Sequence, residues 1–250
     1  MAKYQGIARL RGTIDGVTYL EGAYGRWCRS KTSLNKAVMD ANPKYDTLRL
    51  AQRELGSYSR FGGLLRSGLR QQLRQVKPYR GMERLNKLLH QIKNEDLLHG
   101  LGERTVPTGL ATERGRNLLL GFDFYGQTSV NNLPDREFEL DPATGEALIP
   151  LFNPASELTT PAAATHVAFR SIMIGMDFEA GEVYSKASPV IYLSVDATAA
   201  DLILQPGAPP EVSNLVVYVV QVLFYREVNG FRELGVEGAA LSVVGVEVRS

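Results

Sequence analysis

The chain has 250 residues, of which 44% are hydrophobic and 22% are charged, and its net charge is +1. This composition is typical of a folded globular protein and excludes an intrinsically disordered chain. The single cysteine, Cys28, excludes an intrachain disulfide, a zinc site built from several cysteines, and a small secreted scaffold held together by disulfides.

The near-neutral net charge conceals two oppositely charged parts of the chain. Residues 1–116 contain 22 Lys and Arg against 10 Asp and Glu, a net charge of +12. Residues 117–250 contain 6 against 17, a net charge of −11. We therefore divide the chain into a basic region of β-hairpin and helices, 1–116, and an acidic β-sandwich domain, 117–250. An asymmetry of this size bears on partners and solubility rather than on the fold.

The sequence carries no recognisable targeting signal. Its N-terminal segment lacks an apolar core of signal-peptide length. The longest apolar run, Leu215–Tyr225, is interrupted by Gln221 and is too short for a spanning helix, which needs about 20 residues. We expect cytoplasmic synthesis without a cleavable signal peptide and no membrane span, and the final location of any assembly is left open.

Short strands are predicted in residues 4–31. Asp15-Gly16 stands between β-branched residues, which is typical of a tight two-residue hairpin. A strand at Ile7–Leu10 precedes this hairpin, and a second turn at Gly22–Gly25 leads into Arg26–Arg29. The segment is therefore expected to form a small β meander.

Two helices are predicted in residues 42–100. The first begins at Asn42-Pro43 and ends at Lys77-Pro78, and the pair Gly62-Gly63 could kink it. Its inward face, recognised by apolar residues three, four or seven apart, comprises Leu48, Leu55, Leu65, Leu69 and Leu73. The second helix ends at Gly100. Its apolar face comprises Met82, Leu85, Leu89 and Ile92.

Residues 118–250 show turn signals every 8–15 residues without a helical pattern, which predicts an antiparallel β-sandwich. Asn229-Gly230 is a second tight hairpin turn, and Gln205–Pro210 is a loop because proline cannot donate to a ladder. The apolar run Leu215–Tyr225 requires cover on both faces, from a second sheet or from another copy. The predicted fold class is α+β, with an N-terminal β meander and helical hairpin followed by a C-terminal antiparallel β-sandwich.

Arginines gather on the first predicted helix. The set is Arg49, Arg53, Arg60, Arg66, Arg70 and Arg74. The last three stand four apart and are predicted to form one stripe, and Glu54 is the only acid between Asp46 and Glu83. Such a surface pairs with acidic residues of a neighbour, follows the phosphates of a nucleic acid, or is merely solvated. We favour an interface.

Acidic residues alternate with apolar ones ahead of the turn Asp141–Gly145, so their side chains share one strand face. The acids are Asp135, Glu137, Glu139 and Asp141. Their spacing is not that of a calcium-binding loop. We expect an exposed acidic face. As a docking face for basic neighbours it would involve Glu137, Glu139 and Asp141.

No catalytic, cofactor-binding or metal-ligating set stands out, and the P-loop, nucleophile-elbow and zinc-helix motifs are missing. Cys28 has arginines nearby but no base placed to activate it, so it is expected to fill a core position on a strand. His90 and His99 would face opposite sides of a continuous helix, and His166 opens a strand alone. We expect neither an enzyme, a cofactor nor a small-molecule substrate.

Several short segments are distinctive: Arg11-Gly12-Thr13-Ile14, Gly16-Val17-Thr18-Tyr19, Leu64-Leu65-Arg66, Leu69-Arg70, Leu120-Gly121-Phe122-Asp123-Phe124 and Phe224-Tyr225-Arg226-Glu227-Val228-Asn229-Gly230. Through these segments the chain resembles an uncharacterised family of hypothetical proteins from Bacteroidota and their mobile elements. The similarity spans nearly the whole chain. It implies a shared domain order, no assigned activity and no catalytic residue. A looser likeness, through Arg29-Ser30-Lys31 and Asn42-Pro43, is to small phage-associated proteins.

These observations favour a structural subunit that self-assembles into a homopolymer such as a filament, tube or virion-like particle, with copies of itself as partners. The alternative is a nucleic-acid-binding accessory protein of a mobile element, whose basic helices bind the duplex backbone. A third interpretation, a carbohydrate- or surface-binding β-sandwich, is disfavoured because the only tryptophan, Trp27, lies outside the predicted sandwich.

Overall fold

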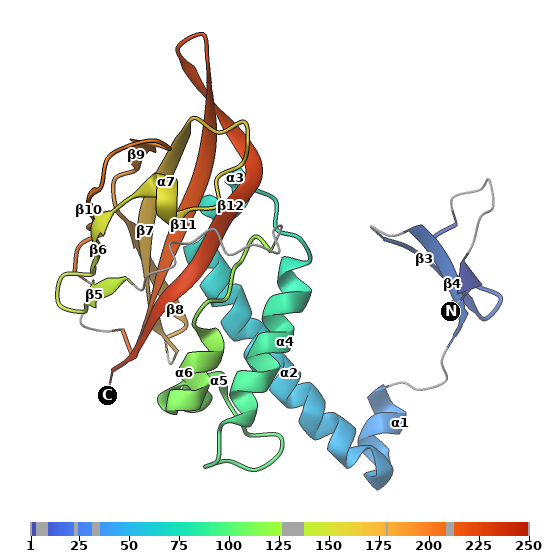
Figure 1. The fold of residues 1–250 in the computed structure, drawn as a ribbon. Coiled ribbons are helices and arrows are strands. Elements are labelled where there is room, and N and C mark those ends of the chain that lie inside the picture. The colour runs from blue at the N-terminus through green and yellow to red at the C-terminus, as the bar shows by residue number, and fades with distance from the viewer. Residues whose placement is uncertain are drawn as a thin grey trace. The chain divides into compact units, whose positions relative to one another are not determined.

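Figure 1 shows the fold in a computed structural model, which describes residues 2–3, 10–22, 25–31, 36–126, 138–178, 180–208 and 213–249. Helices and antiparallel sheets together confirm the predicted α+β class. The chain divides into two compact units, 1–50 and 51–250. This boundary differs from the change in charge at 116/117, because the helices after Leu50 share a core with the strands that follow.

The first unit contains the predicted β meander, whose strands lie in the order β1-β4-β3-β2. Their bounds are β1 (Ala2–Lys3), β2 (Gly12–Ile14), β3 (Val17–Gly22) and β4 (Gly25–Ser30). Asp15 and Gly16 have φ angles of 48° and 77°, which confirms the tight turn between β2 and β3. Most of the predicted strand Ile7–Leu10 lies outside the described residues. Helix α1 (Lys36–Ala41) and the 3₁₀ turn η1 (Pro43–Tyr45) follow.

The helices that follow are shorter and more numerous than predicted. They are α2 (Asp46–Gly68), which begins in the first unit, α3 (Gln72–Gln75), α4 (Gly81–Asn94), α5 (Val106–Ala111) and α6 (Glu113–Leu119). The prediction of one helix up to Lys77 is wrong. A Cβ on Gly68 would lie 2.9 Å from Ile174 Cγ2, and the Ser185 hydroxyl donates to the Gly68 carbonyl at 2.7 Å. Contacts with the sheet therefore accompany the end of α2.

The predicted inward face of α2 is correct only in its C-terminal half. Leu65 of α2 is fully buried, and so is Leu69 in the turn that follows the helix. Leu48 and Leu55, by contrast, are 41% and 46% exposed. Leu73, on α3, is partly buried. In the N-terminal half the buried position belongs to Glu54, which lies seven residues before Phe61 on the same face. On α4 the buried residues include Leu85, Leu89 and Ile92, whereas Met82 is exposed.

Helix α2 continues without interruption through Gly62 and Gly63, the pair that could kink it. A Cβ on Gly62 would lie 3.0 Å from Leu89 Cδ1 of α4, whereas a Cβ on Gly63 would meet nothing within 4 Å. Gly62 thus permits close packing of α2 against α4, and Gly63 has no such contact.

The second unit contains two antiparallel sheets. The central sheet, ordered β12-β11-β7-β8 with β9 also paired to β7, comprises β7 (His166–Asp177), β8 (Glu182–Ala187), β9 (Ile191–Ser194), β11 (Leu215–Val228) and β12 (Phe231–Val248). The small sheet, ordered β10-β6-β5, comprises β5 (Glu139–Asp141), β6 (Glu146–Phe152) and β10 (Ala200–Leu204). A single turn of helix, α7 (Pro154–Glu157), follows β6.

These elements form three layers, with the central sheet in the middle (Figure 1). Leu65 and Leu89 of the helices pack in one core with Val217 and Val219 of β11. The other side of β11 packs against the small sheet in a second core. The apolar run Leu215–Tyr225 is therefore covered on both faces by its own chain, so its cover requires no other copy.

Gln221, the polar interruption of this run, connects the sheet to the helical layer. Its amide nitrogen donates to the Tyr125 hydroxyl and to Gln75 Oε1, both at 2.7 Å. The Tyr125 hydroxyl donates to the Gln72 carbonyl at 2.9 Å, and burial raises the pKa of this phenol. The Gln221 amide nitrogen and the Tyr125 hydroxyl thus both have partners in this buried group, as a buried site requires.

The last two strands form the longest hairpin of the molecule. Asn229 and Gly230 have φ angles of 53° and 80°, which confirms the predicted turn. Strand β7 pairs with β11 only as far as Tyr225, so the hairpin extends past its neighbour (Figure 1). The outer edge of β12 is covered in its middle, where the Gly121 and Phe124 amides donate to β12 carbonyls, each at 2.8 Å.

Candidate functional site

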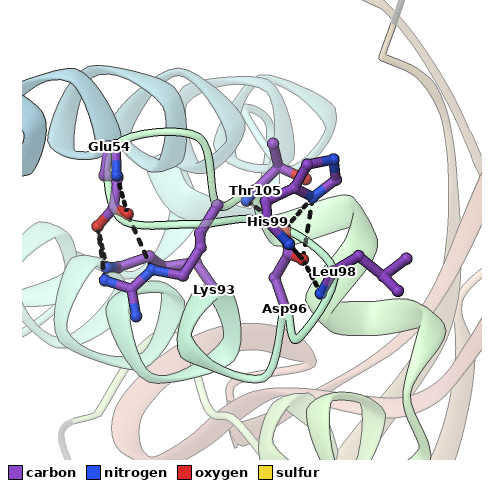
Figure 2. A network of polar contacts seen from close by, with 8 residues as sticks. Glu54, Lys93, Asp96, Leu98, His99 and Thr105 are labelled. Atoms are coloured by element: carbon purple, nitrogen blue, oxygen red, sulfur yellow. Dashed lines mark hydrogen bonds and ion pairs between the residues drawn. The ribbon is translucent and has the colours of Figure 1, made fainter.

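A buried ion-pair network lies beneath the exposed side of α2 (Figure 2). Glu54 is 3% exposed and Lys93 of α4 is 2% exposed. The Glu54 carboxylate pairs with Lys93 and accepts hydrogen bonds from Arg104 Nε at 2.9 Å and the Gly102 amide at 2.8 Å. Burial alone would raise the pKa of Glu54, but hydrogen bonds from Arg104, Lys93 and Gly102 outweigh burial and lower the pKa to about 2.

Asp96 shapes the segment between α4 and α5 (Figure 2). Its carboxylate accepts hydrogen bonds from the amides of Thr105 at 2.9 Å and Leu98 at 3.1 Å, and lies 2.9 Å from His99 Nδ1. Burial alone would raise the pKa of Asp96, but these hydrogen bonds lower it. The resulting turn presents Leu97 and Leu98 to solvent, with 85% and 84% exposure.

Neither buried carboxylate is arranged for proton transfer. Both Glu54 and Asp96 are at most 3% exposed, and their oxygens are occupied by donors. An acid–base group works best with a pKa near the working pH, whereas the pKa of Glu54 is about 2. We assign a stabilising role to both residues, because they fix α2, α4 and the segment between α4 and α5 in one arrangement.

The predicted arginine stripe does not lie on one helix, because α2 ends at Gly68. Arg53 and Arg60 stand seven residues apart on one side of α2, Arg70 lies in the turn after it, and Arg74 lies on α3. All four side chains are exposed, and none makes an ion pair with a described residue. Because the only acid of this stretch is buried, the surface of residues 47–82 carries no carboxylate.

The other two arginines of the set bind their own backbone. Arg49 donates to the Met39 and Asp40 carbonyls and pairs with Asp46, so it holds α1 against the start of α2. Arg66 Nε donates to the Gly62 carbonyl at 3.0 Å. The freely presented basic surface therefore consists of Arg53, Arg60, Arg70 and Arg74, and we call these four residues the basic surface.

The described members of the acidic set, Glu139 and Asp141, lie on the small sheet, on the opposite side of the central sheet from the helical layer. Glu139 and Asp141 are exposed on β5, and Asp141 also accepts hydrogen bonds from the Ala143 amide and the Thr144 hydroxyl, which lower its pKa. Asp135 and Glu137 lie outside the described residues. Asp201 of β10 is likewise exposed on this sheet, and the prediction did not include it.

A hollow of about 460 Å³ opens between α2, the start of α5 and the turn after β7. Its floor contains the rings of Phe61 and Phe178, stacked with centroids 5.3 Å apart, and Arg60 and Ser57 lie at its rim. A second hollow of about 240 Å³ shares Pro107 and Phe178 with it and continues to Leu215 and Val248. We call the two together the apolar groove.

The tip of the β11–β12 hairpin presents an unusual side chain to solvent. Phe231 follows the Asn229-Gly230 turn and is 76% exposed. Glu233 stands two residues further along β12, so both side chains project from the same face of the strand. Glu233 is exposed and makes no ion pair with a described residue. The tip therefore combines an exposed aromatic ring with a carboxylate that stands opposite Arg226 of β11 without an ion pair to it.

The remaining candidates carry no assembled chemistry. Cys28 is half-buried on β4 rather than in a core. His99 lies beyond the end of α4, so it shares no helix with His90, which packs edge-on against Tyr58. Within the described ranges, no three His, Cys, Asp or Glu side chains are placed to hold a metal ion. None of the described helices is long and apolar enough to cross a bilayer.

Sequence reasoning missed the ion-pair network, the apolar groove and the exposed ring of Phe231. One signal for the network was available, because Glu54 is a lone acid in a basic helix and such a residue is a candidate for internal pairing. Comparison with known proteins adds no assignment, since no family model, curated protein or solved structure matches the chain.

Proposed function

We propose that the protein is a structural subunit that self-assembles into a homopolymer through its basic surface and the acidic small sheet. The observation that carries the proposal is electrostatic. Every ion pair that the structure describes joins two residues of the same part of the chain, either 1–116 or 117–250. The two parts have net charges of +12 and −11, and no ion pair among the described residues joins one part to the other.

The placement of these charges favours repeated contacts between copies. The basic surface belongs to the helical layer and the acidic strands belong to the small sheet, with the central sheet between them. Two different, complementary surfaces on opposite sides of one subunit form a heterologous contact, which generates a ring or an open helical array. Charge complementarity in such a contact sets the rate of encounter and the register.

Charge reversal tests the proposal. We expect the wild type to form polymers in negative-stain images and light scattering at low salt. A variant with Arg53, Arg60, Arg70 and Arg74 all changed to Glu should remain a monomer. Its melting temperature should stay close to that of the wild type, because the four arginines are exposed and even an exposed ion pair contributes only about 0–1 kcal/mol to stability.

A matched variant, with Glu139 and Asp141 changed to Lys, should also fail to assemble alone. In a mixture with the Arg-to-Glu variant, the lysines of one variant meet the glutamates of the other, so polymers should form again. A wild-type protein that stays a monodisperse monomer at high concentration and low salt would overturn the proposal.

Nucleic-acid binding is the second candidate, supported by the four unpaired arginines of the basic surface. Four phosphate contacts would give a slope of about −3.6 for log K against log salt, at roughly 0.9 per contact. A gel-shift series in rising salt, with wild type and the Arg-to-Glu variant, measures this slope. No retention of duplex DNA at low salt would exclude this second candidate.

A further inference from the structure

The apolar groove and the hairpin tip lie at opposite ends of the same two strands. Leu215 and Val248, which line the groove, are the first residue of β11 and the last residue of β12. Phe231 begins β12 beside the turn at the far end. A strand of 14 residues spans about 46 Å at roughly 3.3 Å per residue, so the two features are too far apart to meet within one molecule.

The two features are complementary in chemistry. The tip carries an exposed ring, Phe231, with the carboxylate of Glu233 about 7 Å further along the same strand face, at roughly 3.3 Å per residue. The groove carries stacked rings, Phe61 and Phe178, with the guanidinium of Arg60 at its rim. Neither Glu233 nor Arg60 has an ionic partner among the described residues.

We infer that the tip of one copy docks in the apolar groove of the next, with Phe231 against Phe61 and Phe178 and with Glu233 paired to Arg60. This inference rests on the proposed self-assembly and adds a second contact between copies, in which Arg60 of the basic surface takes Glu233 as its partner. An aromatic anchor in an apolar pocket, with a charged pair at its edge, has the composition of an interface hot spot. The tight turn and the paired strands hold the anchor in place before binding, which lowers the entropy cost of association.

The geometry makes the contact directional. Because donor and acceptor surfaces lie at opposite ends of the hairpin, each copy that accepts a tip at its groove still offers its own tip. The contact is heterologous, and repetition of it extends a chain of subunits along the hairpin direction instead of closing a two-fold dimer.

Disulfide trapping between copies tests the placement. The natural thiol is first removed by Cys28→Ser, which leaves a background without cysteine. One preparation then carries Ser57→Cys at the groove and the other carries Glu233→Cys at the tip. Oxidation of the mixture should give a covalent dimer on a non-reducing gel. A control preparation with Ser156→Cys, exposed on α7, should give none with the groove variant.

Substitutions at the contact give a second test. The quantity measured is the lowest protein concentration at which polymers form. Phe231→Asp should raise this concentration at least tenfold, whereas Tyr184→Asp, at an exposed ring on β8, should leave it unchanged. Arg60→Glu and Glu233→Arg should each raise it, and the double exchange should restore it.

The outcomes separate this contact from assembly itself. Crosslinking together with rescue by the double exchange supports the inference. Wild-type polymers that give no crosslink and tolerate Phe231→Asp would overturn the docking contact while leaving self-assembly intact. A wild-type protein that remains monomeric would overturn both.

Discussion

Glu54 shows how one residue affects both the core and the surface. It is the only acid between Asp46 and Glu83, and on the outside of α2 it would neutralise part of the basic surface. Inside the protein it pairs with Lys93 and Arg104 instead. The same carboxylate therefore ties α2 to α4 and leaves the surface of residues 47–82 without negative charge.

We predict that Glu54 makes the protein less stable in acid. Its pKa is about 2 in the folded protein against 4.5 for the free side chain. A carboxyl group with a depressed folded pKa contributes stability that is present above pH 4.5 and is lost as the pH falls towards 2. The loss amounts to roughly 3 kcal/mol at 1.36 kcal/mol per pKa unit. Urea unfolding at several pH values should show it in the wild type and not in Glu54→Gln.

The same variant should be less stable at neutral pH, by about 3–5 kcal/mol, because it leaves the buried ammonium of Lys93 without its partner. Adding Lys93→Met removes that charge and should recover most of the loss. A Glu54→Gln protein with the stability and acid dependence of the wild type would contradict the assignment.

At the scale of elements, α2 and the turn that follows it offer a matched test of the corrected inward face. Leu69→Asp places a charge where the side chain is fully buried and should prevent folding of the helical layer. Leu55→Asp places the same charge where the leucine is 46% exposed and should melt within a few degrees of the wild type. Equal melting temperatures for the two variants, measured by circular dichroism, would mean that the burial of α2 is misassigned.

The paired glycines of α2 give a second test. Gly63→Ala should stabilise the protein by up to about 1 kcal/mol, because alanine favours a helix and the added methyl group meets nothing. Gly62→Ala gains the same propensity but presses on Leu89 of α4 at 3.0 Å, so it should be the less stable of the two. Thermal melts that rank the variants in the opposite order would contradict the close packing of α2 and α4.

The elements that could be predicted from the sequence are those specified by neighbouring residues. Asp15-Gly16 and Asn229-Gly230 adopt positive φ angles, so the amino-acid choice itself indicates the turn. The end of α2 could not be predicted, because the hydroxyl that binds the Gly68 carbonyl belongs to Ser185, 117 residues later. Leu55 was predicted to face inward because the helical pattern counts only apolar residues as buried. The residue buried at this level of α2 is instead its neighbour Glu54.

At the scale of the whole molecule, we predict that polymers weaken as salt rises. The Debye length falls from about 10 Å at 0.1 M to about 3 Å at 1 M salt, which screens exposed charges. Since the apolar run of β11 is covered by its own chain, it cannot offset this loss between copies. Light scattering across this range measures the change. Polymers that salt leaves intact would contradict a charged contact and point to the apolar contact of Phe231.

The candidate surfaces were partly predictable because counting charges needs no fold. The basic surface and the acidic strand could both be named in advance, whereas the groove and the network could not. Phe61 and Phe178 meet across more than a hundred positions of chain, and Arg104 reaches Glu54 across 50. Such pairings depend on how the layers pack, and no local pattern records them.

The double cover of β11 also has a consequence for biosynthesis. Ten consecutive residues of this strand, from Leu215 to Phe224, are buried, and they contain neither a charge nor a proline. During translation this segment leaves the ribosome before β12 exists to pair with it, so one of its edges is bare for a time. Uncharged, β-branched segments of this kind stack readily with copies of themselves. A strand that is covered on both faces in the finished protein is thus exposed to self-association in the nascent chain.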